Sequence, residues 1–162
     1  MFQQESSLNI LKDIAMKVYG LNQKWNLNFI LGYTDTETIK LDFDRTPFKT
    51  VRYCALRTMK RFKLGGFIIL KSSKSHYHIV FNRKVSWSEN MHIVVWVYLQ
   101  SHNEALKKWF VMQCIKESST LRVSPKGRKP SPRIVYRYGR QDKEIRDFLR
   151  YRRLIKNIMK RT

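Results

Sequence analysis

The chain has little cysteine and no long apolar segment. Its two cysteines, Cys54 and Cys114, lie inside apolar helical patterns and give neither a disulfide framework nor a zinc site. No apolar run reaches membrane-spanning length, and the N-terminus lacks the charged segment and apolar core of a signal peptide. These absences argue against disulfide-rich and membrane-spanning proteins, and a reducing, cytoplasmic location fits them.

Acidic residues are also scarce. Twelve Asp and Glu stand against 33 Lys and Arg, giving a formal net charge of +21 and a pI near 10.3. Such an excess of one sign destabilises the compact state by self-repulsion, so solubility alone does not explain it. The chain also contains four Trp, eight Tyr and nine Phe. We therefore expect a nucleic-acid partner, DNA (single-stranded or duplex) or RNA, and no membrane.

Internal repeats and low-complexity linkers are absent as well. At 162 residues, 43% of them apolar, the chain is long enough to bury one core without further staples. We expect a single nucleic-acid-binding domain over 1–162, with an N-terminal extension (1–37), a core (38–138) and a C-terminal basic helix (140–162).

The core begins with a strand whose side chains alternate strictly. In Ile39–Asp44 apolar and polar residues alternate with a period of two, which is typical of a half-buried strand. Leu41 and Phe43 therefore point to one face, and Asp42 and Asp44 point to the other.

A helix is expected after this strand, with Thr46 as N-cap and Pro47 at the first helical position. It runs to about Phe62, before Gly65-Gly66. Its apolar residues form one stripe, so the helix covers a sheet and shows a basic side to solvent.

Two further strands are expected over 67–70 and 76–81. In the second strand His76 and His78 share the face opposite Tyr77. The order strand, helix, strand, strand is the first half of a split βαβ, ferredoxin- or RRM-like layout. This predicts an α+β fold with a mainly antiparallel sheet, helices on one face, and the first and third strands side by side at the sheet centre.

This layout brings four polar side chains to one open face of the sheet: Asp42, Asp44, His76 and His78. Two carboxylates and two imidazoles in one place favour a metal or phosphate site.

The flanking segments contribute further elements. We expect a helix over 8–19 and a strand over 25–33, which is either an extra strand or a hairpin partner of 39–44 across 34–36. Further elements are a helix over 86–99 opened by a Ser86/Glu89 capping box, a helix over 104–114, and strands over 119–123 and 133–138.

Two basic segments follow. The loop 124–132 has three prolines and three basic residues, so it should be extended and positive. The last helix, 141–160, either caps the sheet or pairs with a partner. The predicted nucleic-acid contacts are Lys126, Arg128, Lys129, Arg133, Arg146, Arg150 and Arg153.

Three segments carry a family resemblance: Leu41-Asp42-Phe43-Asp44, the Ser-rich turn and His strand of 71–79, and the Arg-bearing strand and basic loop of 120–129. In order and spacing they resemble archaeo-eukaryotic primases, and more closely the compact primase-polymerases of archaeal plasmids and viruses. The resemblance covers roughly 39–135.

The resemblance implies a DNA-replication protein of an archaeal mobile element, with nucleoside triphosphates and a replication protein as further partners. Asp42 and Asp44 would ligate Mg²⁺ or Mn²⁺, and His78 would complete the catalytic set. The nucleotide would contact Ser72, Ser73, Lys74, His76 and Arg122. The family's third metal carboxylate has no clear match, and Glu117 is the nearest acid, so the chain is either a minimal enzyme or one that has lost catalysis.

Two alternatives remain. His76-Tyr77-His78 also resembles the paired-histidine (HUH) motif of rolling-circle replication initiators and relaxases, which nick DNA with a helical Tyr. That Tyr usually has a Lys three or four residues later, which neither Tyr98 nor Tyr151 has. The other alternative is a non-catalytic DNA- or RNA-binding protein.

Overall fold

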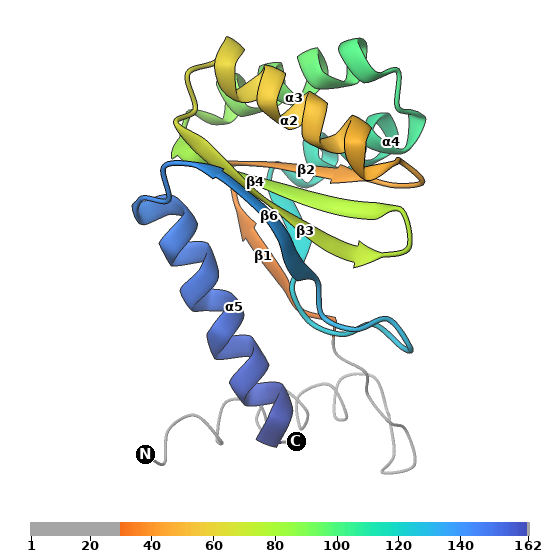
Figure 1. Ribbon diagram of the computed structural model, residues 1–162, viewed down its shortest axis with the longest axis vertical. Helices are drawn as coiled ribbons and strands as arrows, with labels where there is room; N and C mark the ends of the chain where they lie inside the picture. Colours follow the sequence, from red (N-terminus) through yellow and green to blue (C-terminus); the bar gives the residue numbers. More distant parts are fainter. Residues whose placement is uncertain (1–29, 162) are drawn as a thin grey trace.

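The computed structural model describes residues 30–161, and it has an α+β architecture (Figure 1). Three helices cover one face of a four-stranded antiparallel sheet, while a fourth helix and a two-stranded sheet pack on the other face. In chain order the elements are β1 (Gly32–Asp35), β2 (Thr38–Phe43), α2 (Phe48–Arg61), β3 (Gly66–Ser73), β4 (His76–Lys84), α3 (Trp87–Ser101), α4 (Glu104–Lys116), β5 (Ser119–Arg122), β6 (Arg133–Gly139) and α5 (Lys143–Arg161).

The four-stranded sheet has the order β2-β4-β3-β6, and each neighbouring pair is antiparallel. β4 lies between β2 and β3, as the split βαβ layout predicts. The expectation that both the first and the third strand are central is wrong, because β2 is an outer strand of this sheet. β5 does not extend the sheet beyond β2; it pairs with β1 instead.

The pairing of β1 corrects the hairpin alternative. Thr34 and Asp35, expected in a turn, belong to β1, and their partners are in β5. The Asp35 carboxylate accepts hydrogen bonds from the Thr38 backbone N–H at 2.8 Å and from Lys40 Nζ at 2.9 Å. These bonds turn the chain between β1 and β2. The helix expected over 8–19 and most of the strand expected over 25–33 lie outside the described residues.

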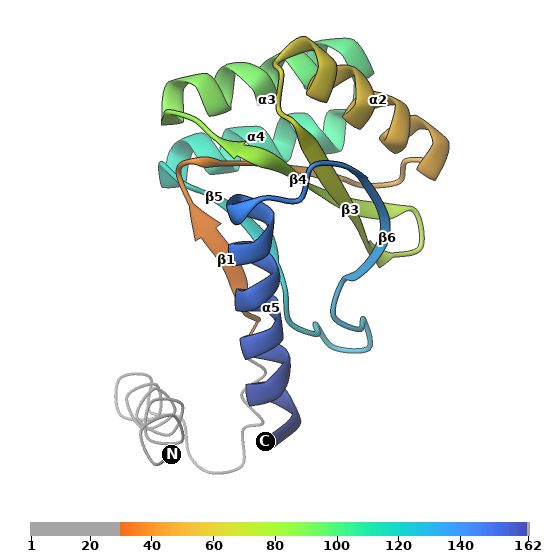
Figure 2. The same cartoon turned by 60° about the vertical axis from the view of Figure 1, so that its left-hand side comes forward.

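Apolar side chains form two clusters, one on each face of the sheet. The first joins the sheet to α2, α3 and α4 through residues such as Leu41, Phe43 and Phe81. The second joins Ile68 and Val80 to α5 and β5. Of the two roles left open for the last helix, the structure shows the capping one, since α5 covers part of the second face (Figure 2).

The structure tests the N-terminal caps that the sequence predicts for α2 and α3. At the start of α3, Ser86 Oγ accepts from the Glu89 backbone N–H at 3.2 Å, which is one of the two bonds of the predicted capping box. The Thr46 cap is wrong: Pro47 occupies the N-cap of α2 with no side-chain bond, and Thr46 Oγ1 donates to the Asp44 carbonyl instead. Within 30–161 no helix is both long and apolar enough to cross a membrane.

Candidate functional site

The paired strands β2 and β4 bring the predicted acids and histidines together. Asp42 lies directly opposite His78 in the antiparallel register. Because Leu41 and Phe43 are buried against the helices, Asp42 and its neighbour Asp44 project from the other face. His76 and His78 do the same on β4, so the predicted cluster is present.

The cluster forms two acid–imidazole pairs. His78 Nε2 lies 3.5 Å from Asp42 Oδ1, and His76 Nε2 lies 3.6 Å from Asp44 Oδ1. Both separations exceed a good N–H···O hydrogen bond. His76 Nδ1 lies 2.5 Å from the Lys74 carbonyl, which only accepts, so Nδ1 carries the proton. In neutral His76 the unprotonated Nε2 therefore faces the Asp44 carboxylate.

The cluster is less open than the sequence suggests. The His78 side chain is 5% exposed, against 27% for Asp42 and 49% for Asp44. His78 is buried because β4 is an inner strand, with β2 on one side and β3 on the other. Its Nδ1 has no hydrogen-bond partner within the described chain.

Burial also shifts the protonation of the inner pair. Burial, helped by the charge of Asp44, raises the pKa of Asp42 to about 7, and Arg122 opposes the rise. Burial and the cations Arg122 and Arg152 lower the pKa of His78 to about 3. At neutral pH His78 is thus uncharged, and Asp42 is poised to gain or lose a proton.

Arg122, predicted to contact a nucleotide, joins three segments. Its Nη2 donates to Ser72 Oγ at 2.8 Å and to the Ser72 carbonyl at 3.2 Å. Its Nη1 donates to the carbonyls of Ser124, at 2.5 Å, and Pro130, at 3.0 Å. The guanidinium therefore holds the basic loop against the end of β3. Its Nε–H group takes part in none of these four bonds.

The basic loop presents two lysines side by side. The backbones of Lys126 and Lys129 exchange hydrogen bonds of 2.9 and 3.0 Å across a tight turn. Gly127 takes φ of +54° in that turn, a left-handed conformation that glycine adopts without strain. Both lysines are exposed, so their ammonium groups are available to an anion.

These groups surround one recess of about 270 Å³. The residues that line it come from β2 and the segment just after it, from β3, β4 and β5, from the basic loop and from the chain before β1: Ile30, Asp42, Asp44, Ser72, Ser73, His76, His78, Arg122, Lys126 and Lys129. The recess thus unites nine predicted site residues. Six others lie outside its lining: Lys74, Arg128, Arg133, Arg146, Arg150 and Arg153.

Sequence reasoning missed Arg152 of α5. Its guanidinium donates to the Pro132 carbonyl at the end of the basic loop, and its charge contributes to the lowered pKa of His78. The sequence signalled only a basic helix, and three other arginines of α5 were chosen. Which side of α5 faces the basic loop depends on how the helix packs on the sheet, and the sequence pattern does not show this.

The third carboxylate of the family pattern has no counterpart in the recess. Glu117 caps the C-terminus of α4 in a left-handed conformation and is not among the lining residues. Across residues 30–161 no group of three or more His, Cys, Asp or Glu side chains is arranged to hold a metal ion. A cation here would have to rely on Asp42 and Asp44, with other ligands from water or substrate.

No tyrosine in the described part of the chain lines the recess. Tyr98 Oη donates to Glu104 in the helical layer, and Tyr151 Oη donates to the Gly32 carbonyl. The nicking alternative would need one of them, or a tyrosine outside the described residues, to move to the histidines.

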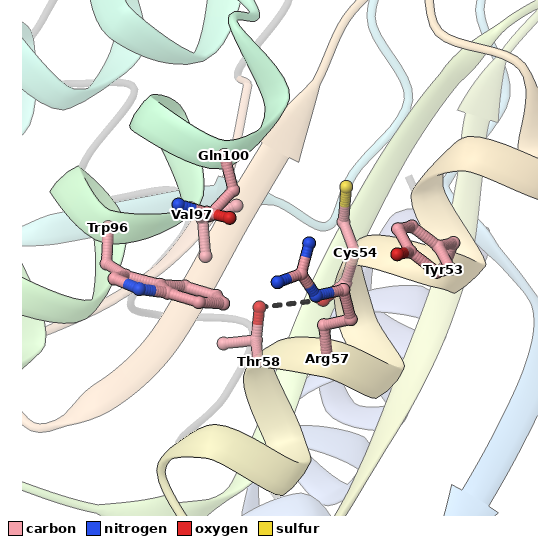
Figure 3. A pocket seen from close by; sticks show the side chains of 7 residues that line it. All are labelled: Tyr53, Cys54, Arg57, Thr58, Trp96, Val97 and Gln100. Carbon is pink, nitrogen blue, oxygen red and sulfur yellow. Dashed lines mark hydrogen bonds between the residues drawn. The ribbon is translucent and has the colours of Figure 1, made fainter.

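A second hollow lies between α2 and α3 (Figure 3). Tyr53, Cys54, Arg57 and Trp96 are among its lining residues, and Thr58 donates to the Cys54 carbonyl at 2.7 Å. Its volume of about 20 Å³ holds no more than a water molecule. The larger polar recess is therefore the better candidate for a ligand site.

Comparison with known proteins adds no assignment: no family model, curated protein or solved structure matches the chain.

Proposed function

We propose that the protein acts on nucleic acid and that its recess binds a divalent metal ion together with the phosphates of a nucleotide, as a primase-polymerase does. The observation that carries this proposal is the convergence of two carboxylates, two histidines and three cationic side chains around one recess. The resemblance to the compact archaeal primase-polymerases implies roles for the two carboxylates, the two histidines and Arg122, while the two lysines are predicted from the charge of the basic loop.

The recess is lined by both acidic and basic side chains, which suits a metal–phosphate ligand. Asp42 and Asp44 can offer hard oxygen ligands to Mg²⁺ or Mn²⁺, while Lys126 and Lys129 can neutralise phosphate oxygens. A bound metal ion would neutralise the phosphates and stabilise a leaving pyrophosphate. A simple anion would not account for the carboxylates, and a simple cation would not account for the lysines.

The acid–imidazole pairs also favour a cation. In the neutral state Nε2 of His76 and the Asp44 carboxylate are two acceptors 3.6 Å apart. Two facing acceptors repel each other unless a proton or a metal ion lies near both. The exposure of Asp44 leaves that position open to solvent and to an incoming ion.

The size of the recess limits what it encloses. Pockets that bury a whole small molecule span roughly 300–1,000 Å³, so about 270 Å³ is just below that range. The phosphates would occupy the recess, and the sugar and base would lie outside it. Base recognition would then come from a template strand.

The decisive experiment is Mn²⁺-dependent nucleotide incorporation on a single-stranded template, with nucleic-acid binding measured in parallel. Asp42→Ala/Asp44→Ala should abolish incorporation and retain binding. Glu89→Ala/Glu104→Ala is the matched control, since it removes the same charge from two exposed acids outside the recess. It should leave both properties unchanged.

Two other outcomes reject nucleotidyl transfer. No incorporation by the unmodified protein, with salt-sensitive binding in both variants, would indicate a binding protein without catalysis. A covalent protein–DNA adduct that disappears on Tyr151→Phe or Tyr98→Phe would instead show a nicking initiator.

A further inference from the structure

The outward side of α2 is basic and has no acidic neighbour in the helix. The helix contains five cationic residues and no Asp or Glu. All five are exposed, and none forms a salt bridge within residues 30–161. They are Lys49, Arg52, Arg57, Lys60 and Arg61. This surface lies on the opposite face of the sheet from the recess.

Two exposed tyrosines lie on the same face of the sheet as these cations. Tyr53 of α2 is 58% exposed, and the guanidinium of Arg57 lies over its ring at 5.7 Å from the centroid. Tyr138 of β6 is 42% exposed, and one side of its ring stacks on Phe67 at 5.8 Å with an interplanar angle of 25°. Both rings therefore combine a supported orientation with access to solvent.

Tyr53 and Arg57 lie on the flank of α2 that faces α3, where they line the small hollow with Trp96, and α2 meets β6 on its other flank. Arg52, next to Tyr53 in the chain, lies over the ring of Tyr136 at 5.6 Å from the centroid. Tyr136 shares its side of β6 with Tyr138, since both rings contact Phe67. Figure 2 shows α2 above the sheet on the side where β6 is the outer strand. We call this set the α2–β6 surface: the five cations of α2 with Tyr53, Tyr136 and Tyr138.

Folding alone does not require this arrangement. The buried side of α2 already packs through Val51, Cys54 and Ala55. Exposed aromatic rings on the same face as unpaired cations instead match the requirements of an unpaired nucleic-acid strand. Its bases stack on aromatic faces, and its phosphates attract Lys and Arg. A duplex keeps its bases stacked inside and would use only the cations.

We propose that the α2–β6 surface binds single-stranded nucleic acid, with bases stacking on Tyr53 and Tyr138 and phosphates contacting the cations of α2. The surface is separate from the basic loop and α5, where the sequence places nucleic-acid contacts. The inference shares with the proposed function only the class of partner, and it does not require the recess to bind a metal or a nucleotide.

The test measures the binding of labelled oligonucleotides of about 16 nucleotides by fluorescence anisotropy at fixed salt, with single-stranded DNA, single-stranded RNA and duplex DNA as separate arms. Tyr53→Ala/Tyr138→Ala changes no charge and should weaken single-strand binding by about tenfold or more. Duplex binding should stay within about twofold, because the cations remain.

Three comparison variants sharpen the result. Tyr53→Phe/Tyr138→Phe keeps the rings and should bind as the unmodified protein does. Leu99→Ala/Ile115→Ala removes two exposed side chains from α3 and α4 and should have no effect. Arg57→Gln removes one phosphate contact, so for single strands the plot of log affinity against log salt concentration should become less steep by about one. If the double Ala variant folds poorly, the salt dependence of Arg57→Gln still tests whether the α2–β6 surface contacts phosphates.

The proposal is rejected if the double Ala variant, shown by circular dichroism to be folded, binds single strands as the unmodified protein does. It is also rejected if single-strand and duplex binding fall equally, or if the unmodified protein does not bind single strands. Asp42→Ala/Asp44→Ala separates this inference from the proposed function, because it should stop incorporation and leave single-strand binding intact.

Discussion

The two faces of the four-stranded sheet use the same strands for different purposes. On the face beneath α2, α3 and α4, side chains such as Phe43 and Ile79 are fully buried in an apolar cluster. On the other face α5 covers Val80, while Asp42 and His78 line a polar recess. Neighbouring residues of one strand thus contribute either to stability or to the site. Substitutions at alternate positions should separate the two properties.

The largest expected effect is a loss of stability on substitution in the apolar cluster beneath the helices. Phe43→Ala should lower the free energy of unfolding by about 3–5 kcal/mol, because it leaves a cavity in a fully buried cluster. Asp44→Ala, one residue away and half exposed, should change it by less than about 0.5 kcal/mol. Urea denaturation measures both. Similar losses would contradict the division between the faces.

A smaller effect is expected where the two sheets meet. The fully buried Lys40 donates to Asp35 and to the Ser119 carbonyl, each at 2.9 Å. Breaking a buried ion pair costs about 3–5 kcal/mol, but Asp35 keeps its bonds to Thr38 and some contact with water. We therefore expect Lys40→Ala to cost about 2 kcal/mol by urea denaturation. A neutral result would show that the pair does not hold β5 against β2.

The recess should itself reduce stability. Because burial raises the pKa of Asp42 from 3.8 to about 7, the folded state holds the proton longer than the unfolded state does. Stability from this group is therefore lost as pH rises from about 4 to 7. Asp42→Asn should raise the free energy of unfolding at pH 8 by about 1 kcal/mol and have little effect below pH 4. Comparing the two proteins cancels the opposite contribution of His78. A destabilised Asn variant at pH 8 would refute this account.

A separate effect, measured on ligand binding and not on stability, concerns metal affinity. A protonated Asp42 cannot ligate a cation, so the proposed Mn²⁺ binding would have to release its proton. Below about pH 7 the affinity should fall up to tenfold per pH unit, and above that value it should level off. Titration calorimetry in buffers of different ionisation enthalpy would report the released proton. An affinity independent of pH between 5 and 7 would exclude Asp42 as a ligand.

Much of the site follows from period-two patterns. The alternation in β2 and β4 shows which residues share a face, because a strand leaves its side chains only two directions. Together with the split βαβ layout, which pairs the two strands, it places Asp42, Asp44 and both histidines side by side. The burial of His78 depends on which strands flank β4, and the β1–β5 pairing depends on residues far apart in the chain. Nor does the pattern show that Arg122 bonds to Ser72, 50 residues away. Such contacts follow from tertiary packing, which local periodicity does not encode.

The outer position of β6 has a consequence for self-association. Within the described residues one edge of β6 has no neighbouring strand, so its free backbone groups resemble a template for another chain. Arg133, Arg137 and Arg140 are exposed along and just beyond this strand. Like charges at an edge oppose the approach of a second copy, which is one way that sheet proteins avoid edge-to-edge aggregation. These arginines therefore oppose self-association through the free edge of β6.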